Sequence, residues 1–404
     1  MKITDVEIIP IAPKLAERYA HRRVDLYGID CRVVYKVTTD NGIVGYGEQR
    51  LRPWASVDQA SVEPLIGRNP FDYINTTLNG GVGGALYDVM GKYLEVPAYK
   101  LMGQKVRDAV SMAAWTRPAG PEEFAREIKR AADQGYSIFK MHSCRYHDVI
   151  EQTRAACDVA PDGFKIHWDF NGTRTLASVI PLVHQFEREF PIVGFVEDPV
   201  ERKDIEGWRT LRQQSRIPIV LHVPQLGGLQ EVLHGTADIY MIGGSVGDTL
   251  ARGMAYSKAN IQTIMQHGAG TLSKALALHM AAVLPSASGH SIHLDDQYEE
   301  DITTERIPVV EGFSPVPEGP GMGYEVDEQA LARVSAQKIV EKPRHVGVLH
   351  LAGGHTFYGR SYIAPEGEEG VVRGFTSELW EDDGSEEFER VFERVQKEGK
   401  FLAN

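Results

Sequence analysis

Three short stretches decide the fold of this chain: Phe139–His142 (FKMH), Trp168–Asn171 (WDFN) and Val196–Pro199 (VEDP). Each follows a hydrophobic run of the kind that forms strands, and the lysine, aspartate and glutamate that they carry are 29 and 28 residues apart. This distance accommodates one strand and one helix. In a parallel barrel the active site is built where the strands end. The stretches therefore predict a barrel whose active site contains a lysine, an aspartate and a glutamate on successive strands.

The same period continues along the chain. Strand-type runs lead to His222, Gly243, His267 and His293 at intervals of 21 to 26 residues, and Ser111–Trp115 forms a further run before the first of the three stretches. Strand-type runs that alternate with helical stretches indicate a parallel α/β sheet. Eight such units predict an α/β fold of the (β/α)8-type barrel.

The residues on either side of the barrel have other patterns. Residues 1–105 contain alternating runs joined by an Asn41-Gly42 turn and are expected to form an α+β capping domain whose loops cover the site. The barrel itself is assigned to residues 106–329. Residues 330–404 hold a strand-type run and an acidic amphipathic helix, and we expect this extension to pack on the capping domain or to form an oligomer contact.

The composition narrows the function classes. The chain has 404 residues and a net charge of −13, which argues against nucleic acid and anionic membrane as partners. Its three cysteines form no motif, which favours a reducing compartment over a disulfide framework. No apolar run approaches the ~20 residues of a membrane helix, and the N-terminus lacks the apolar core of a signal peptide. We therefore expect a cytoplasmic protein that acts on small molecules.

The chain resembles the enolase superfamily, in the branch similar to mandelate racemase and muconate lactonizing enzyme. Val33–Glu48 resembles the N-terminal hairpin of that family, Gly84–Lys92 the helix that leads to the barrel, and Pro317–Gly323 the segment that closes it. The resemblance covers roughly residues 1 to 330. It implies that a base removes the proton α to a carboxylate while one divalent cation, normally Mg²⁺, stabilises the enediolate. It also makes a homo-oligomer the expected assembly.

The resemblance assigns catalytic roles residue by residue. Lys140 matches the first lysine of the family's Lys-x-Lys motif, and His142 stands where the second lysine usually acts as the base. His267 matches the seventh-strand histidine, which acts as base or acid. Asn171 matches a polar residue that often contacts the substrate two positions beyond the first metal ligand.

The metal site matches in part. Asp169 and Glu197 correspond to the first two metal ligands, but the third position, normally acidic, is occupied by His222. Imidazole is a poor ligand for Mg²⁺ and a good one for Mn²⁺, Fe²⁺ or Zn²⁺. Two alternatives stay open. In the first, the site binds a softer metal through Asp169, Glu197 and His222. In the second, it binds Mg²⁺, with water or Gln225 completing the coordination shell, or the metal site is degenerate.

The sixth strand also departs from the family pattern. It ends at Gly243, where an aspartate usually orients the seventh-strand histidine. We therefore expect His267 to have a lowered pKa and to act as a hydrogen-bond donor or weak acid rather than as a second base. This favours β-elimination over racemisation.

The interpretation that combines these features is a metal-dependent lyase acting on a hydroxylated carboxylate, namely a sugar-acid dehydratase. The alternatives are a racemase, epimerase or cycloisomerase on the same scaffold, or a non-catalytic relative. Residues expected to bind substrate come from the N-terminal loops and the strand ends: Asn171, Arg22, Arg23, Tyr27, Arg52, Trp115 and His293.

Overall fold

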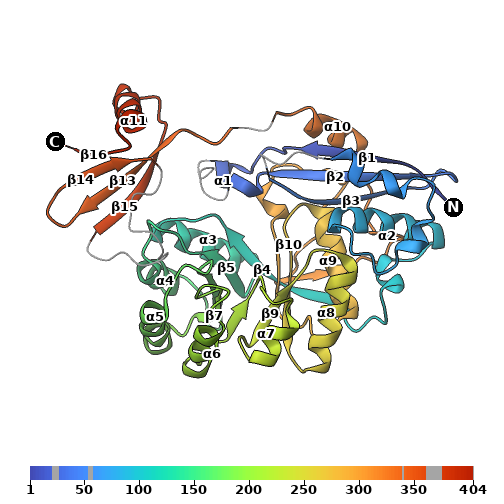
Figure 1. Cartoon of the computed structure of the whole chain (residues 1–404), viewed down its shortest axis with the longest axis horizontal. Helices are drawn as coiled ribbons and strands as arrows, with labels where there is room; N and C mark the ends of the chain where they lie inside the picture. The colour runs from blue at the N-terminus through green and yellow to red at the C-terminus, as the bar shows by residue number, and fades with distance from the viewer. Residues whose placement is uncertain (21–26, 53–57, 339–340, 361–374, 404) are drawn as a thin grey trace. The chain divides into compact units, whose positions relative to one another are not determined.

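The protein contains a closed barrel of eight parallel strands. The computed structural model describes residues 1–20, 27–52, 58–338, 341–360 and 375–403 (Figure 1). Strands β4 to β11 follow one another in sequence order around one sheet, and β11 pairs with β4 to close it. The predicted fold class is confirmed. The eight strands are β4 (Ala109–Thr116), β5 (Ile138–His142), β6 (Lys165–Asp169), β7 (Val193–Glu197), β8 (Ile219–Leu221), β9 (Ile239–Ile242), β10 (Gln262–His267) and β11 (Ser291–His293).

The described residues divide into two compact units, which we describe separately. One comprises the residues up to Trp115 and those from Ile239 to 338. It contains an antiparallel sheet in the order β1-β2-β3, made of β1 (Ile3–Ile11), β2 (Cys31–Thr39) and β3 (Val44–Leu51). Helix α2 (Gly80–Leu94) packs on β3, and its approach is so close that a Cβ at Gly47 would lie 2.1 Å from the carbonyl oxygen of Gly81.

A buried ion pair network joins this sheet to the segment after β11. Arg32 of β2 places Nη1 2.7 Å from Glu48 Oε2 and 2.8 Å from Asp301 Oδ1, and its guanidinium lies over the ring of Tyr298. All three charged side chains are buried. Burial by itself would lower the pKa of Arg32, but the two carboxylates outweigh it and keep the group charged.

The helices of this unit have different neighbours: α8 and α9 contact strand β10 of the barrel, whereas α10 contacts β1 of the antiparallel sheet. Helix α9 is buried along its whole length, which explains its run of apolar residues. The helices are α1 (Glu17–Ala20), α8 (Val246–Lys258), α9 (Thr271–Val283) and α10 (Glu328–Ser335), and the short strand β12 (Phe313–Pro315) pairs antiparallel with β4. Among the helices that the structure describes, we find none with both the length and the apolar character to cross a bilayer.

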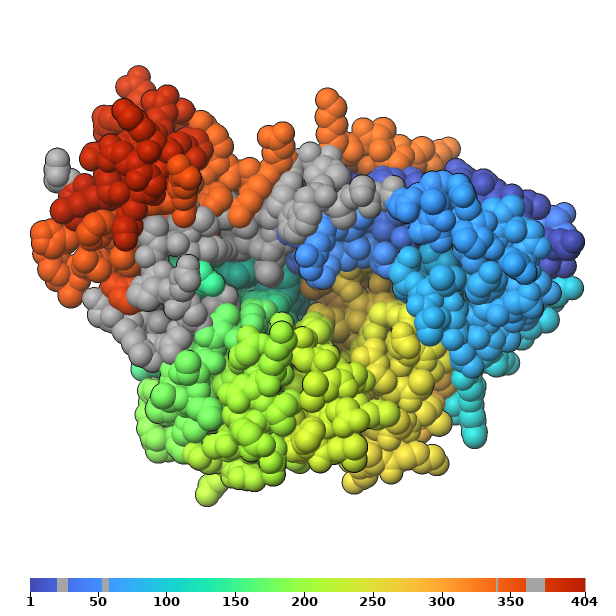
Figure 2. Space-filling view, viewed as in Figure 1, coloured from blue at the N-terminus to red at the C-terminus, as the bar shows by residue number. Residues whose placement is uncertain are grey.

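The second unit comprises Thr116–Asp238 and the residues from 341 onwards. Its helices alternate with β5 to β8 and form the green surface in Figure 2. Lys140 pairs in register with His167, and Asp169 pairs with both His142 and Glu197. This register brings the charged strand ends level with one another. The helices are α3 (Pro121–Asp133), α4 (Val149–Cys157), α5 (Leu176–Glu189), α6 (Ile205–Gln214) and α7 (Leu229–His234).

The C-terminal residues of this unit form a small sheet with one helix. The strand order is β15-β13-β14-β16, and α11 (Glu386–Glu398) packs on it through Phe388, Val391 and Val395. The predicted strand and amphipathic helix are present. Ser377 donates a hydrogen bond to the carbonyl oxygen of Arg145 in the loop after β5. The strands are β13 (His345–Leu351), β14 (Thr356–Gly359), β15 (Phe375–Glu381) and β16 (Lys400–Leu402).

Burial of His279 on α9 predicts an acid-sensitive fold. Its Nε2 lies 3.2 Å from the carbonyl oxygen of Met322, and burial lowers the pKa of His279 from 6.5 to about 4. The imidazole stabilises the fold fully above pH 6.5, and this contribution is lost as the pH falls towards 4, because the unfolded chain binds the proton first. The loss amounts to about 3 kcal/mol.

We expect His279→Gln, which keeps a donor towards Met322 but does not titrate, to remove that part of the pH dependence. Urea unfolding between pH 7 and 4 measures it. The exposed His355→Gln serves as the control and should follow the wild type. Equal slopes for His279→Gln and wild type would contradict the account.

Candidate active site at the ends of strands β5 to β8

The centre of the site is the buried ammonium group of Lys140. Its Nζ lies 2.7 Å from Asp169 Oδ2 and 3.5 Å from Glu197 Oε2. All three side chains are almost completely buried. Burial by itself would lower the pKa of Lys140, but Asp169 and Glu197 outweigh it and raise the pKa above its ordinary value. Lys140, Asp169 and Glu197, which the sequence spacing placed on successive strand ends, therefore lie in one cluster.

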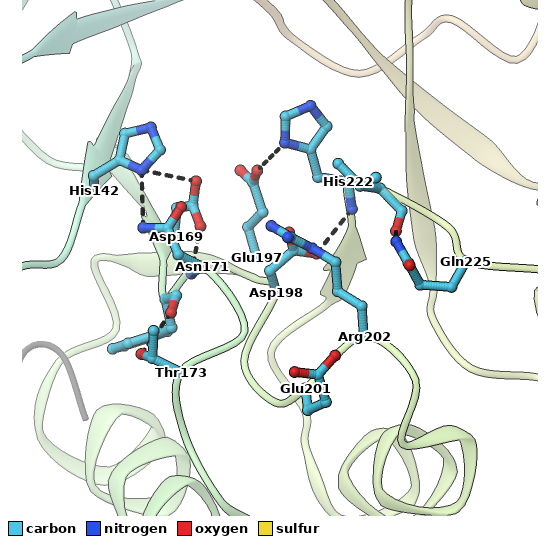
Figure 3. Close-up of polar contacts among 12 residues, drawn as sticks. His142, Asp169, Asn171, Thr173, Glu197, Asp198, Glu201, Arg202, His222 and Gln225 are labelled. Atoms are coloured by element: carbon cyan, nitrogen blue, oxygen red, sulfur yellow. Dashed lines mark hydrogen bonds and ion pairs between the residues drawn. The ribbon is translucent and has the colours of Figure 1, made fainter. Parts of the chain in front are cut away.

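His142 extends this cluster towards solvent. Its Nε2 lies 3.0 Å from Lys140 Nζ, while its Nδ1 lies 3.1 Å from Asp169 Oδ2 and 3.2 Å from the side-chain nitrogen of Asn171 (Figure 3). Burial and the neighbouring Lys140 lower the pKa of His142 to about 4. The neutral ring with its proton on Nδ1 can donate to Asp169 and accept from Lys140 through Nε2. His142 is thus placed to exchange a proton with Lys140.

Asp169 is held by the turn that follows its strand. The backbone N–H of Asn171 donates to Asp169 Oδ1 at 2.8 Å. Asn171 itself adopts a left-handed conformation, with φ of 51°, which asparagine tolerates better than most residues. The asparagine of the WDFN stretch therefore orients the carboxylate as well as presenting its own amide to the site.

Glu197 is surrounded by nitrogen atoms. His222 Nδ1 lies 3.1 Å from Oε1, and His167 Nε2 lies 2.8 Å from Oε2. These are hydrogen-bonding distances but not hydrogen-bonding angles, so among the described residues both buried oxygens of Glu197 lack a well-directed donor. Burial alone would raise the pKa of Glu197, but Lys140 and the histidines hold it well below its usual range. The carboxylate is therefore ionised and has lone pairs available for a cation.

Asp198 lies beside Glu197 but has other partners. Its Oδ1 accepts a hydrogen bond from the backbone N–H of His222 at 3.0 Å, and its Oδ2 pairs with the guanidinium of Arg202 (Figure 3). One oxygen atom each of Glu197 and Asp198 and one nitrogen of His222 lie within 4.8 Å of one another. Both oxygens of Asp198 hold His222 and Arg202. Both oxygens of Asp169 are likewise engaged, by Lys140 and by the backbone of Asn171, so a cation would displace a partner from either carboxylate.

The donor types of the predicted set suit a divalent cation, but Asp169 is not among the groups whose donor atoms already lie within 4.8 Å of one another in the described residues. Asp169, Glu197 and His222 offer two ionised carboxylates and an imidazole on three consecutive strands, β6 to β8. Burial lowers the pKa of His222, but Glu197 and Asp198 outweigh it and raise the pKa. A cation with a borderline preference for nitrogen and oxygen ligands, such as Mn²⁺, Fe²⁺ or Zn²⁺, suits this set better than Mg²⁺ does.

His267 ends strand β10 in the other compact unit. A Cβ at Gly243 would lie 2.2 Å from the carbonyl oxygen of Gln266, so this backbone geometry leaves no room for an aspartate there. Burial lowers the pKa of His267 to about 4, as expected for a histidine without an acidic partner at that position. The ring is therefore neutral at physiological pH.

The residues expected to bind substrate have mixed placements. Trp115 is buried, packs against the ring of Tyr19, and its carbonyl oxygen accepts a hydrogen bond from Tyr19. His293 is also buried, with Nε2 2.9 Å from Ser291 Oγ and Nδ1 3.1 Å from the carbonyl oxygen of His267. Arg52 is exposed. Their contacts with substrate stay predictions.

The remaining loop residues cannot be compared with the structure. Arg22 and Arg23 lie outside the described residues, and for Tyr27 only the backbone, at the start of a short 3-10 helix, is described. The expectation that these loops bind substrate is therefore carried forward unchanged.

Two residues of the site were not singled out from the sequence. His167 is absent from the residues predicted from the sequence, and Asp198 appears there only as part of the VEDP stretch. A signal for His167 was present, because residues two apart on a strand point to the same face, and His167 precedes Asp169 by two positions. For Asp198 the signal was weaker, since its side chain is directed by a left-handed backbone with φ of 42°.

Comparisons with known proteins identify the family of the barrel. A family model described as "Enolase C-terminal domain-like" matches residues 123–330. The chain is 25% identical over 376 residues to a D-gluconate dehydratase of Thermoproteus tenax, a match that covers 82% of this chain and 74% of that protein. It is 29% identical over 215 residues to a D-galactonate dehydratase of Pectobacterium atrosepticum, covering 46% of this chain and 56% of that protein.

Solved structures share the fold. An N-succinyl Arg/Lys racemase from Bacillus cereus has a TM-score of 0.70 at 21% identity, covering 83% of this chain and 99% of its own. A 3,6-anhydro-D-galactonate cycloisomerase from Zobellia galactanivorans has a TM-score of 0.66 at 20% identity, with the same coverage of 83% and 99%. At this level of identity the likeness concerns the fold alone.

The ion pairs of Lys140 predict how stability responds to its removal. Lys140→Met leaves two buried carboxylates without their cationic partner, which should lower the free energy of unfolding by roughly 3–5 kcal/mol. Added Mn²⁺ should stabilise this variant more than the wild type, because no ammonium group competes for the carboxylates. Thermal unfolding with EDTA or with Mn²⁺ measures both effects.

The control is Lys129→Met, which removes an exposed ion pair of 2.8 Å with Asp133. It should cost at most about 1 kcal/mol and leave the response to Mn²⁺ unchanged. The account would be contradicted if Lys140→Met matched this control.

Proposed function

The chain belongs to the enolase superfamily, in the branch similar to mandelate racemase and muconate lactonizing enzyme, and from this premise we propose that it is a metal-dependent sugar-acid dehydratase. Membership makes it an enzyme of a family whose members use a divalent metal ion. The names of its relatives, D-gluconate dehydratase and D-galactonate dehydratase, support a hydroxylated carboxylate as the substrate class.

The observation that carries the proposal is the position of Lys140 between two carboxylates. Nζ lies 2.7 Å from Asp169 and 3.5 Å from Glu197, which puts an amine directly beside the groups that would hold the cation. An α-proton next to a carboxylate is a very weak acid. Its removal requires a base and a positive charge at neighbouring positions in a dry site, and this cluster supplies both.

In the proposed reaction Lys140 would act as the base in its neutral form, which it would reach once a divalent cation took over the two carboxylates that hold its proton. It would then remove the α-proton, and His142 would pass it on. The 3.0 Å contact between Lys140 Nζ and His142 Nε2 provides the path for this transfer. When bound by Asp169, Glu197 and His222, the divalent cation supplies the charge that stabilises the enediolate. His267, which is neutral at rest, takes up a proton from solvent and delivers it to the leaving β-hydroxyl, which departs as water, and the enol product tautomerises to an α-keto acid. Asn171 is proposed to hold the substrate beside His142.

Elimination is favoured over racemisation by the surroundings of His267. A racemase requires a second base on the opposite side of the substrate. Gly243 provides no carboxylate for His267, and burial keeps the ring neutral. An imidazole with a lowered pKa is a weak base for an α-proton, whereas its protonated form, once made, is a strong acid towards a leaving hydroxyl.

Loss of the base or of a metal ligand should abolish turnover. We expect Lys140→Ala and Glu197→Gln each to lower kcat by about 10²–10⁴-fold or more on an aldonic-acid panel that includes D-gluconate and D-galactonate. Formation of the α-keto acid product gives the rate, with Lys129→Ala as the control. Unchanged turnover in both variants on every substrate would refute the proposal.

Reaction in D₂O separates the two chemistries. A dehydratase should release water and give an α-keto acid. Deuterium incorporated at the α-carbon without loss of water would instead identify a racemase or epimerase.

A change of the third ligand tests the metal assignment. His222→Glu restores a carboxylate at the end of β8 and should shift the preference from Mn²⁺ towards Mg²⁺, because Mg²⁺ favours oxygen ligands. The ratio of the two dissociation constants, measured by competition, reports this shift, and His222→Gln serves as a neutral control. An unchanged ratio in His222→Glu would exclude His222 as a ligand.

A further inference from the structure

His167 is a buried ionisable residue that the proposed reaction does not use. It lies in the middle of β6, is fully buried, and its ring packs against Phe195 with the ring centroids 5.5 Å apart. Its Nε2 lies 2.8 Å from Glu197 Oε2, closer than the 3.5 Å of Lys140 Nζ to the same oxygen. This contact places a polar ring directly against a carboxylate of the proposed metal site.

The two carboxylates of the proposed metal site are supported in different ways. Asp169 is short, and the backbone N–H of Asn171 fixes its Oδ1. Glu197 has one more rotatable bond, and among the described residues its oxygens are approached by side chains alone. Two of these side chains, Lys140 and His222, are themselves assigned to the reaction or to the metal. His167 is the third.

We propose that His167 is a positioning residue that holds the carboxylate of Glu197 in the orientation that binds a divalent cation. The proposal rests on the metal centre of the proposed function. The His167 ring contacts Oε2 of Glu197. The other oxygen, Oε1, lies next to His222 and is left for the cation that Glu197 and His222 are proposed to bind. An imidazole ring can supply an N–H donor to the carboxylate from beneath the strand end, as the outer partners of metal ligands commonly do.

The support also frees Lys140. Lys140 and His167 pair in register and both approach Glu197 Oε2. If Lys140 were the only group near this oxygen, its movement towards substrate would leave a buried oxygen without a donor, at a cost of about 1–3 kcal/mol. With His167 in place, the oxygen keeps a neighbour throughout the reaction.

The test compares two substitutions of equal length. His167→Gln retains an N–H donor, whereas His167→Met fills a similar volume without one. Titration of the purified full-length protein with Mn²⁺ alone gives the dissociation constant. We expect His167→Met to weaken Mn²⁺ binding by about 10–100-fold, and His167→Gln to stay within about threefold of the wild type.

The buried His279→Met, on α9, is the matched control, since it should lower stability without changing Mn²⁺ affinity. Equal affinity in His167→Met and wild type would overturn the positioning role while the metal centre stands. Equal loss in both His167 variants would also overturn it, because a structural role does not distinguish the donor. If His167→Met does not fold, a tenfold loss in His167→Gln contradicts the proposal. No Mn²⁺ binding by the wild type would overturn it together with the metal centre.

Discussion

The site depends on one physical constraint: a buried ammonium group must meet buried carboxylates. Removing Lys140, Asp169 or Glu197 from water alone would cost several kcal/mol, and their mutual attraction offsets this only at close range. The register of β5, β6 and β7 provides that range, because Asp169 is level with both His142 and Glu197, and Lys140 is level with His167. The strand pairing and the charge cluster therefore require each other.

The same constraint explains why the neighbouring groups are polar but mostly uncharged. His142 has its pKa lowered by burial and by Lys140, so that it adds no further positive charge to the cluster. His222 replaces an acidic residue, which leaves the cluster with two carboxylates facing one lysine. Asp198, on a left-handed backbone, pairs with Arg202, which balances its charge beside the cluster. The result is a site in which a divalent cation and the lysine compete for the same two carboxylates.

Much of this architecture could be predicted from the sequence, because it depends on periodic features. The spacing of Lys140, Asp169 and Glu197 identified the strand ends, and the glycine at 243 indicated that His267 lacks an acid there. The support of Glu197 by His167 was missed, since a histidine inside a strand of apolar and aromatic neighbours resembles a packed core residue. Asp198 was missed as well, because its role follows from a positive φ that no pattern reveals. Trp115 was expected at the substrate, and its ring packs on Tyr19.

The most direct test of the account is anomalous diffraction from crystals of the full-length protein grown with Mn²⁺. The account predicts one manganese peak within coordination distance of Asp169, Glu197 and His222, with the amine of Lys140 turned away from the carboxylates. The account would be contradicted by a manganese peak elsewhere, or by no peak at a saturating Mn²⁺ concentration, with Lys140 still paired to both carboxylates.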